Sequence, residues 1–290
     1  MEVSVSAAAK INLFLEILDK RQDSYHNIET VMQSVSLYDT ITIVNSANFN
    51  ANLTLNGDIN AKIKPKNNTV YKAANAFFDY TGIKTTGLEI TIKKNIPLCA
   101  GLAGGSADAA ATLLALDRIF KTTLKIDQLK KIGEKIGADV PFCISGGTSL
   151  AQGIGTKLTT LPHLPKCFFV IVKPEFNIST KNAYELFDNT HKLDKKNATQ
   201  IIKAVKNQDI KTVSNLLFNR FEKSVSTKIA ALKSKLTKCG ALGSCMTGSG
   251  STVFGVFDNE NLALKCQELL HKRHKASFLC EPTKAALTFL

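Results

Sequence analysis

Alternating apolar and polar residues predict several β-strands along the chain. Because neighbouring side chains of a strand point to opposite faces, an alternating run predicts a strand with one buried face. The alternating runs are Val3–Val5, Ile11–Ile17, Val35–Val44 and Leu88–Ile92. Small residues at 7–9 separate the first two runs and predict a bend between two strand segments. Further short strands are predicted around Leu53 and Leu55 and at 148–151, 168–172, 252–257 and 276–279.

Elsewhere, apolar residues spaced three or four positions apart predict helices. The predicted helices cover about 70–80, 109–120, 126–136, 180–188, 196–206, 209–218, 226–238 and 261–274. Polar residues 67–69 precede the first helix and Gly82 follows it, which are typical helix start and stop signals. Strands interleaved with helices without strict β-α-β alternation predict the α+β class.

A change in composition at 161–166, where two prolines flank His163, predicts a boundary between two domains. With 290 residues the chain has room for an N-terminal domain, 1–160, and a C-terminal domain, 161–290. No apolar run approaches the ~18 residues of a membrane span, and the first residues lack a basic leader, so we expect a cytoplasmic protein. Seven scattered cysteines without a CxxC spacing predict reduced thiols.

The chain is basic, with a formal net charge of +13 at pH 7. Such a charge suits a polyanionic partner, which could be a nucleic acid, a membrane surface or a phosphorylated small molecule. The lysines are spread along the chain, however, and no aromatic-rich RNA-binding strand accompanies them. The charge therefore supports an anionic ligand without deciding which class it belongs to.

The most informative stretch is a glycine-rich loop between the strand at 88–92 and the helix at 109–120. The loop residues are Pro97, Leu98, Cys99, Ala100, Gly101, Leu102, Ala103, Gly104, Gly105, Ser106 and Ala107. Glycines allow the backbone to approach a ligand closely, and a helix N-terminus offers free N–H groups to an anion. The pattern favours a phosphate site, with an ordinary glycine turn capped by Ser106 or Asp108 as the alternative.

Several familiar phosphate loops are excluded by their spelling. The chain contains neither GxxxxGK[ST] nor GxGxxG, so it carries no P-loop and no Rossmann fingerprint. The glycine-rich run at 248–253 is followed by no HRD or DFG motif, so it is not a protein-kinase loop.

Three further positions could carry chemistry, although each also has an ordinary structural explanation. Lys10 follows the small residues 7–9 and could be a solvated strand lysine. Tyr25 and His26 form an adjacent pair in a polar, turn-like segment. Asp139 lies between small and apolar residues before Pro141, where it could be a turn residue or a shielded general base.

Taken together, these motifs resemble those of the GHMP kinases, over almost the whole chain. The matching blocks are Ala9-Lys10-Ile11-Asn12, Tyr25-His26, the loop 97–108, Gly137-Ala138-Asp139-Val140-Pro141 and Thr247-Gly248-Ser249-Gly250-Ser251-Thr252-Val253-Phe254. The loop departs from the family pattern at Ala103, where glycine is usual, and at Ala107, where serine is usual. Ala103 fits if its φ is negative, and Ala107 removes a hydroxyl that could have touched phosphate or metal.

The resemblance implies a two-domain fold with an S5-like N-terminal domain and an α/β C-terminal domain. It also implies an ATP-dependent kinase of the non-mevalonate isoprenoid route, whose acceptor is a cytidine-diphosphate-linked sugar alcohol. ATP would bind at 97–107, with Asn68 and Lys94 on the adenine side. It implies no nucleic-acid, membrane or obligate protein partner.

The resemblance also implies roles for individual residues. Asp139 would accept the proton of the acceptor hydroxyl, and Lys10 would orient Asp139 and neutralise charge. Asn12 would hold the acceptor, His26 would read the cytosine edge, and Tyr25 and Tyr184 would enclose the base. Mg²⁺ should accompany ATP; Ser106 is the one ligand that we can name for it.

Two other functions stay open from the sequence. The chain could be another small-molecule GHMP kinase, of the homoserine or mevalonate type. It could also be a basic RNA-binding protein with an S5-like first domain, which predicts strongly salt-dependent RNA binding and no ATP turnover.

Overall fold

A computed structural model describes residues 1–46, 50–55, 58–62, 68–84, 87–189, 194–224 and 227–290. The segments 47–49, 56–57, 63–67, 85–86, 190–193 and 225–226 lie outside the described residues, and with them residue 67 of the polar segment predicted to precede the first helix. The fold contains two sheets and helices from both halves of the chain, so the α+β prediction is confirmed.

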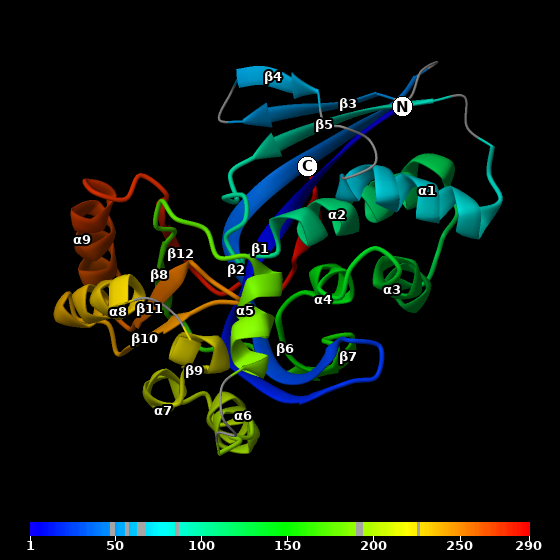
Figure 1. The fold of residues 1–290 in the computed structure, drawn as a ribbon. Helices are drawn as coiled ribbons and strands as arrows, with labels where there is room; N and C mark the ends of the chain where they lie inside the picture. The colour runs from blue at the N-terminus through cyan, green and yellow to red at the C-terminus, as the bar shows by residue number, and fades with distance from the viewer. Residues whose placement is uncertain (47–49, 56–57, 63–67, 85–86, 190–193, 225–226) are drawn as a thin grey trace.

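The larger sheet is built around two long antiparallel strands, β1 (Glu2–Lys20) and β2 (His26–Asn45). Within the described residues it has nine strands, in the order β13-β1-β2-β5-β3-β4, with β6 and β9 paired to β2 and β1, and β7 to β6. The other members are β3 (Asn50–Leu55), β4 (Asp58–Lys62), β5 (Leu88–Lys94), β6 (Thr148–Gly153), β7 (Lys157–Leu161), β9 (Phe218–Asn219) and β13 (Leu287–Phe289). Figure 1 shows β1 and β2 running through the centre of the molecule.

Four helices pack beside this sheet and around the glycine loop. They are α1 (Thr69–Thr81), α2 (Gly104–Phe120), α3 (Ile126–Glu134) and α4 (Val140–Ser145). In Figure 1 they lie together on one side of the long strands, with α2 next to the sheet. The alanines of α2 are buried there, and their small side chains allow a close approach of the helix to β1 and β2.

The smaller sheet belongs to the C-terminal half and has the strand order β10-β11-β8-β12 within the described residues. Its strands are β8 (Phe168–Val172), β10 (Gly243–Met246), β11 (Val253–Phe257) and β12 (Ser277–Cys280). The helices α8 (Thr227–Lys238) and α9 (Glu260–His271) cover it. The short helices α5 (Thr180–Asp188), α6 (Thr199–Lys206), α7 (Ile210–Asn215) and the 3₁₀ turn η2 (Arg220–Ser224) connect the two sheets.

Several sequence expectations need correction. The runs at 3–5 and 11–17 are one continuous strand, and the predicted bend is a register shift between Ala8 and Ala9. His26 is the first residue of β2 rather than part of the loop that contains Tyr25. A short helix, α4, begins directly after Asp139, because Pro141 occupies its first turn, where a missing N–H costs nothing.

The predicted domain boundary at 160/161 stays a prediction. The chain returns to the first sheet twice after this point, through β9 and through β13, which both pair with β1. None of the described helices combines the length and the apolar content needed to cross a membrane.

Candidate active site

A cavity of about 490 Å³ opens where the glycine loop meets β1 and the C-terminal half. All loop residues from Pro97 to Ser106 line it, as do Lys10, Asn12 and Asp139. Tyr25 and Tyr184 line another part of the wall, and Gly248 and Ser249 also contribute. Most of the residues singled out in the sequence therefore surround one space, although they come from distant parts of the chain.

The glycine loop has an unusual backbone. Cys99, Gly101 and Ala103 all have positive φ, of 52°, 73° and 58°. The condition set for Ala103, a negative φ, is therefore not met: an L-residue occupies a left-handed conformation that glycine adopts more easily. Ala103 is also the N-cap of α2, without a side-chain hydrogen bond, so neither Ser106 nor Asp108 caps the helix.

The uncapped N-terminus of α2 leaves donors free to bind an anion. The N–H groups of Ser106 and Ala107 donate to the Ala103 carbonyl, whereas those of Gly104 and Gly105 have no acceptor among the described residues. Free N–H groups and the positive end of the helix dipole favour a phosphate at this point. Gly101 is needed for packing as well, since a Cβ there would lie 2.6 Å from the Thr247 carbonyl oxygen.

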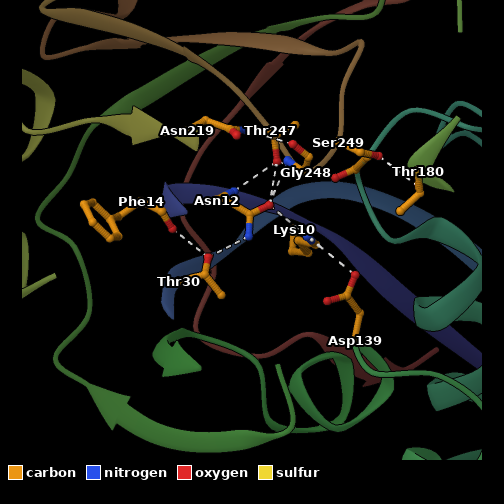
Figure 2. A network of polar contacts seen from close by, with 11 residues as sticks. Lys10, Asn12, Phe14, Thr30, Asp139, Thr180, Asn219, Thr247, Gly248 and Ser249 are labelled. Carbon is orange, nitrogen blue, oxygen red and sulfur yellow. Dashed lines mark hydrogen bonds and ion pairs between the residues drawn. The ribbon is translucent and has the colours of Figure 1, made fainter. Parts of the chain in front are cut away.

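Lys10 and Asp139 both line the cavity, and their side chains point toward each other (Figure 2). The Lys10 ammonium nitrogen lies 3.5 Å from Asp139 Oδ2, so the predicted ion pair is present. The Lys10 side chain is almost fully buried, while the Asp139 side chain is 37% exposed. A carboxylate that is open to the cavity and next to a fixed cation can receive a proton from a bound hydroxyl group.

Asn12 connects Lys10 to the glycine turn at 247–250. Its Oδ1 accepts hydrogen bonds from Lys10 Nζ at 2.9 Å, from the Gly248 N–H at 2.9 Å and from Thr247 Oγ1 at 3.1 Å (Figure 2). Its Nδ2 donates to Thr30 Oγ1 at 2.8 Å. Asn12 is 1% exposed, so it contributes little surface to the cavity wall. Its hydrogen bonds hold the neighbouring residues in place.

On the predicted acceptor side two rings stack, and a third residue, Tyr25, lies on the cavity wall. The His26 and Tyr184 rings stack with centroids 4.6 Å apart, and Tyr25 is 61% exposed on the cavity wall. His26 is buried and does not line the cavity; its Nε2 lies 2.7 Å from Asp188 Oδ1. Partial burial opposes ionisation of Asp188, but hydrogen bonds from Lys20 and His26 outweigh it and lower the pKa of this carboxyl group.

The two residues expected on the adenine side have other partners in the structure. Asn68 is the N-cap of α1, accepting the Val70 N–H, and it does not line the cavity. Lys94 lines the cavity, but its ammonium group binds Asp39 and Asp108. Burial raises the pKa of Asp108 to about 7, although Lys94 opposes this shift. Ala107 is buried inside α2.

Several residues of this region escaped the sequence analysis. Thr30, Asp39 and Asp188 hold Asn12, Lys94 and His26, respectively. Nothing in the local sequence marks them, because each pairing depends on strand register or on a contact between distant segments. Thr180, whose hydroxyl lies 2.9 Å from Ser249 Oγ, was missed for the same reason.

The described residues contain no cluster of three His, Cys, Asp or Glu side chains that could hold a metal ion. Mg²⁺ often keeps several waters and binds chiefly to substrate phosphates, so a dedicated cluster is not required. Ser106 lines the cavity and is the residue there that the sequence analysis named as a ligand for Mg²⁺.

Comparisons with known proteins agree with these motifs. Residues 68–147 match the GHMP kinases N terminal domain, and residues 201–275 match the GHMP kinases C terminal domain. The chain is 41% identical to a 4-diphosphocytidyl-2-C-methyl-D-erythritol kinase of Clostridium novyi (strain NT), over 94% of this chain and 97% of that protein. It is 40% identical to the enzyme of the same name from Clostridium perfringens (strain 13 / Type A), over 95% and 96%.

Solved structures extend the likeness to the fold. A crystal structure of a 4-(cytidine 5'-diphospho)-2C-methyl-D-erythritol kinase superposes with a TM-score of 0.77 at 26% identity, covering 98% of this chain and 100% of that one. A homoserine kinase from Cytophaga hutchinsonii reaches a TM-score of 0.76 at 18% identity, covering 100% and 97%. At that identity the second likeness shows the fold alone.

Proposed function

The chain belongs to the GHMP kinase family, and we propose that it phosphorylates the 2-hydroxyl of 4-diphosphocytidyl-2-C-methyl-D-erythritol with ATP. The acceptor is the one named for the relatives at about 40% identity. The reaction would be a step of the non-mevalonate route to isoprenoid precursors, in the cytoplasm. One observation carries the chemical part of the proposal: the glycine loop and the Lys10–Asp139 pair line the same cavity.

In this proposal the ATP phosphates bind at the start of α2. The free N–H groups of Gly104 and Gly105 hold phosphate oxygens, and the helix dipole adds positive potential where charge develops. Mg²⁺ would arrive with ATP and neutralise phosphate charge, with the Ser106 hydroxyl as its protein contact. On the adenine side, Lys94 would act through the part of its side chain that lines the cavity, and Asn68 would act only by fixing the start of α1, which it caps.

The acceptor hydroxyl would lie between the phosphates and Asp139. Asp139 accepts its proton, and Lys10 keeps the carboxylate in place and stabilises negative charge during transfer. Phosphoryl transfer depends on positioning and charge stabilisation more than on covalent chemistry, and these residues supply both. Asn12 would hold Lys10, Tyr25 and Tyr184 would form the place for the cytosine base, and His26 would act through the Tyr184 ring on which it stacks.

The decisive experiment is an ADP-release assay with a panel of acceptors. The cytidyl diphosphate compound should be phosphorylated, whereas homoserine and mevalonate should give little ADP above the background. Efficient turnover of homoserine or mevalonate would assign the chain to another branch of the family. ADP release with none of the three acceptors, together with tight, salt-dependent binding of RNA, would overturn the kinase proposal.

A further inference from the structure

Three charged side chains lie buried directly beside the glycine loop. They are Lys94 at the end of β5, Asp39 on β2 and Asp108 in the second turn of α2, which are 4%, 0% and 5% exposed. The Lys94 ammonium donates to Asp39 Oδ2 and, at 2.7 Å, to Asp108 Oδ2. Burying charged groups is costly even when they are paired, so stability alone is a weak reason for this arrangement.

The other oxygen of Asp39 holds the beginning of the loop. Asp39 Oδ1 accepts the backbone N–H groups of Asn95 at 2.6 Å and of Ile96 at 2.9 Å. These are the two residues directly before Pro97. Through Lys94 and Asp108, the same carboxylate is also connected to α2, where the loop ends. Asp39 thus binds one end of the glycine loop directly and is connected to the other end through Lys94.

The loop needs such support, because its own backbone is strained. Cys99 and Ala103 are not glycines, yet both have positive φ. Conformations of this kind persist only where the surrounding structure holds them. The side chains of Lys94 and Ile96 also lie directly below Gly104: a Cβ on that glycine would be 3.2 Å from Lys94 Nζ and 3.0 Å from Ile96 Cγ2. A shift of either side chain would move the first turn of α2.

We propose that Asp39 is a positioning residue for nucleotide binding, acting through Lys94 and through the backbone of Asn95 and Ile96. The inference rests on the proposed function, since it takes the glycine loop as the site of the ATP phosphates. Asp39 does not line the cavity and touches no substrate. Its effect is to hold the Gly104 and Gly105 amides where phosphate oxygens can meet them, so its loss weakens ATP binding selectively.

The test compares two variants of Asp39 in the full-length protein. Asp39→Ala removes both sets of contacts, whereas Asp39→Asn keeps an oxygen that can accept from Asn95 and Ile96 but loses the charge that binds Lys94. Calorimetric titration with adenylyl imidodiphosphate, an ATP analogue that is not hydrolysed, should show affinity reduced at least ~10-fold for Asp39→Ala, since several bonds to a charged group are lost. The affinity of Asp39→Asn for the analogue should lie between those of Asp39→Ala and the wild type. In both variants the KM for the acceptor should change less than about twofold.

Asp117 provides a matched control at the opposite end of α2. Its Oδ1 accepts the Leu124 N–H at 2.8 Å and the Thr122 hydroxyl at 2.6 Å, and both of these residues follow the C-terminus of α2. Asp117→Ala should lower the melting temperature and leave the affinity for the analogue unchanged. If Asp39→Ala binds the analogue as tightly as Asp117→Ala, or if it weakens both substrates equally, the positioning role is wrong.

Two further results decide cases that Asp39→Ala alone leaves open: binding of the analogue by two milder variants, and its binding by the wild type. If Asp39→Ala does not fold, Asp39→Asn and Asp108→Asn are judged by the same criterion, because each removes one charge from the buried cluster. A wild-type protein that fails to bind the analogue contradicts the proposed function instead, since the inference about Asp39 concerns only the difference between variants.

Discussion

Two lysine–aspartate groups lie on the wall of the cavity or just behind it, and they differ mainly in their access to solvent. Lys10 meets Asp139 at 3.5 Å, with 37% of the Asp139 side chain exposed. Lys94 meets Asp108 at 2.7 Å, with 7% of the Asp108 side chain exposed, and it also binds the fully buried Asp39. In both groups, the lysine comes from a strand of the larger sheet and one aspartate from the beginning of a helix.

The difference separates a group that can react from a group that holds structure. Asp139 has a long contact with one cation and an open side, so a substrate hydroxyl can approach it. Asp39 accepts three hydrogen bonds and has no open side. The same two residue types thus support proton transfer in one place and loop geometry in the other, and burial decides which.

The largest effect is expected from removing the open carboxylate. Asp139→Asn keeps the shape of the side chain but removes the proton acceptor, and loss of a general base typically costs ~10²–10⁴ in rate. Single-turnover phosphoryl transfer at saturating substrates should slow by that factor, with both substrates still bound and the melting temperature nearly unchanged. A near-normal rate would remove Asp139 from the mechanism.

The buried group should respond in stability instead. Lys94→Met removes the cation and leaves Asp39 and Asp108 buried together without a counter-charge. Breaking a buried ion pair from one side costs about 3–5 kcal/mol. Urea unfolding monitored by circular dichroism should show a loss of that size, whereas Lys10→Met should lose much less, because Asp139 remains in contact with water. Equal losses of unfolding free energy in the two variants would contradict a structural role for the buried group alone.

A pH titration of stability should sharpen the same comparison. The pKa of Asp108 is raised by burial to about 7, so the folded state binds a proton more tightly than the unfolded chain. The stabilisation from this proton is present below about pH 4 and is lost as the pH rises through about 7. It amounts to roughly 4 kcal/mol, at ~1.4 kcal/mol per pKa unit between the ordinary value near 4 and about 7. The Asp108→Asn variant should lack this decline; an identical decline in the variant would assign it to other groups.

The sequence predicted the parts of the site that depend on local pattern. The glycine loop, the Asn68 cap of α1 and the Gly82 stop can be read from neighbouring residues, and the structure has α1 at Thr69–Thr81 between them. Lys10 and Asp139 could be paired only through the family resemblance, since 128 intervening residues separate them in the printed sequence.

The buried connections could not be predicted in this way. Asp39 lies 55 positions before Lys94, and their contact depends on the register between β2 and β5. One residue of shift would turn Asp39 to the other face of the sheet. The very short β9 and the terminal β13 were missed because two or three residues carry too little pattern to predict a strand.

The smallest effect is expected at Ala103, and it tests how strongly the buried group holds the loop. Ala103 has a φ of 58°, which costs an L-residue roughly 1–2 kcal/mol, while glycine costs about 0.5–1 kcal/mol more chain entropy on folding. Ala103→Gly should therefore stabilise the protein by less than ~1 kcal/mol. As long as Asp39 is present, its contacts with Asn95, Ile96 and Lys94 hold the loop in place. The affinity of Ala103→Gly for the ATP analogue should therefore hardly differ from that of the wild type. In an Asp39→Asn background the added glycine should make the loop more mobile, and binding should weaken further. Calorimetry on the two single variants and the double variant measures this coupling, and strictly additive effects would show that Asp39 does not act on the loop conformation.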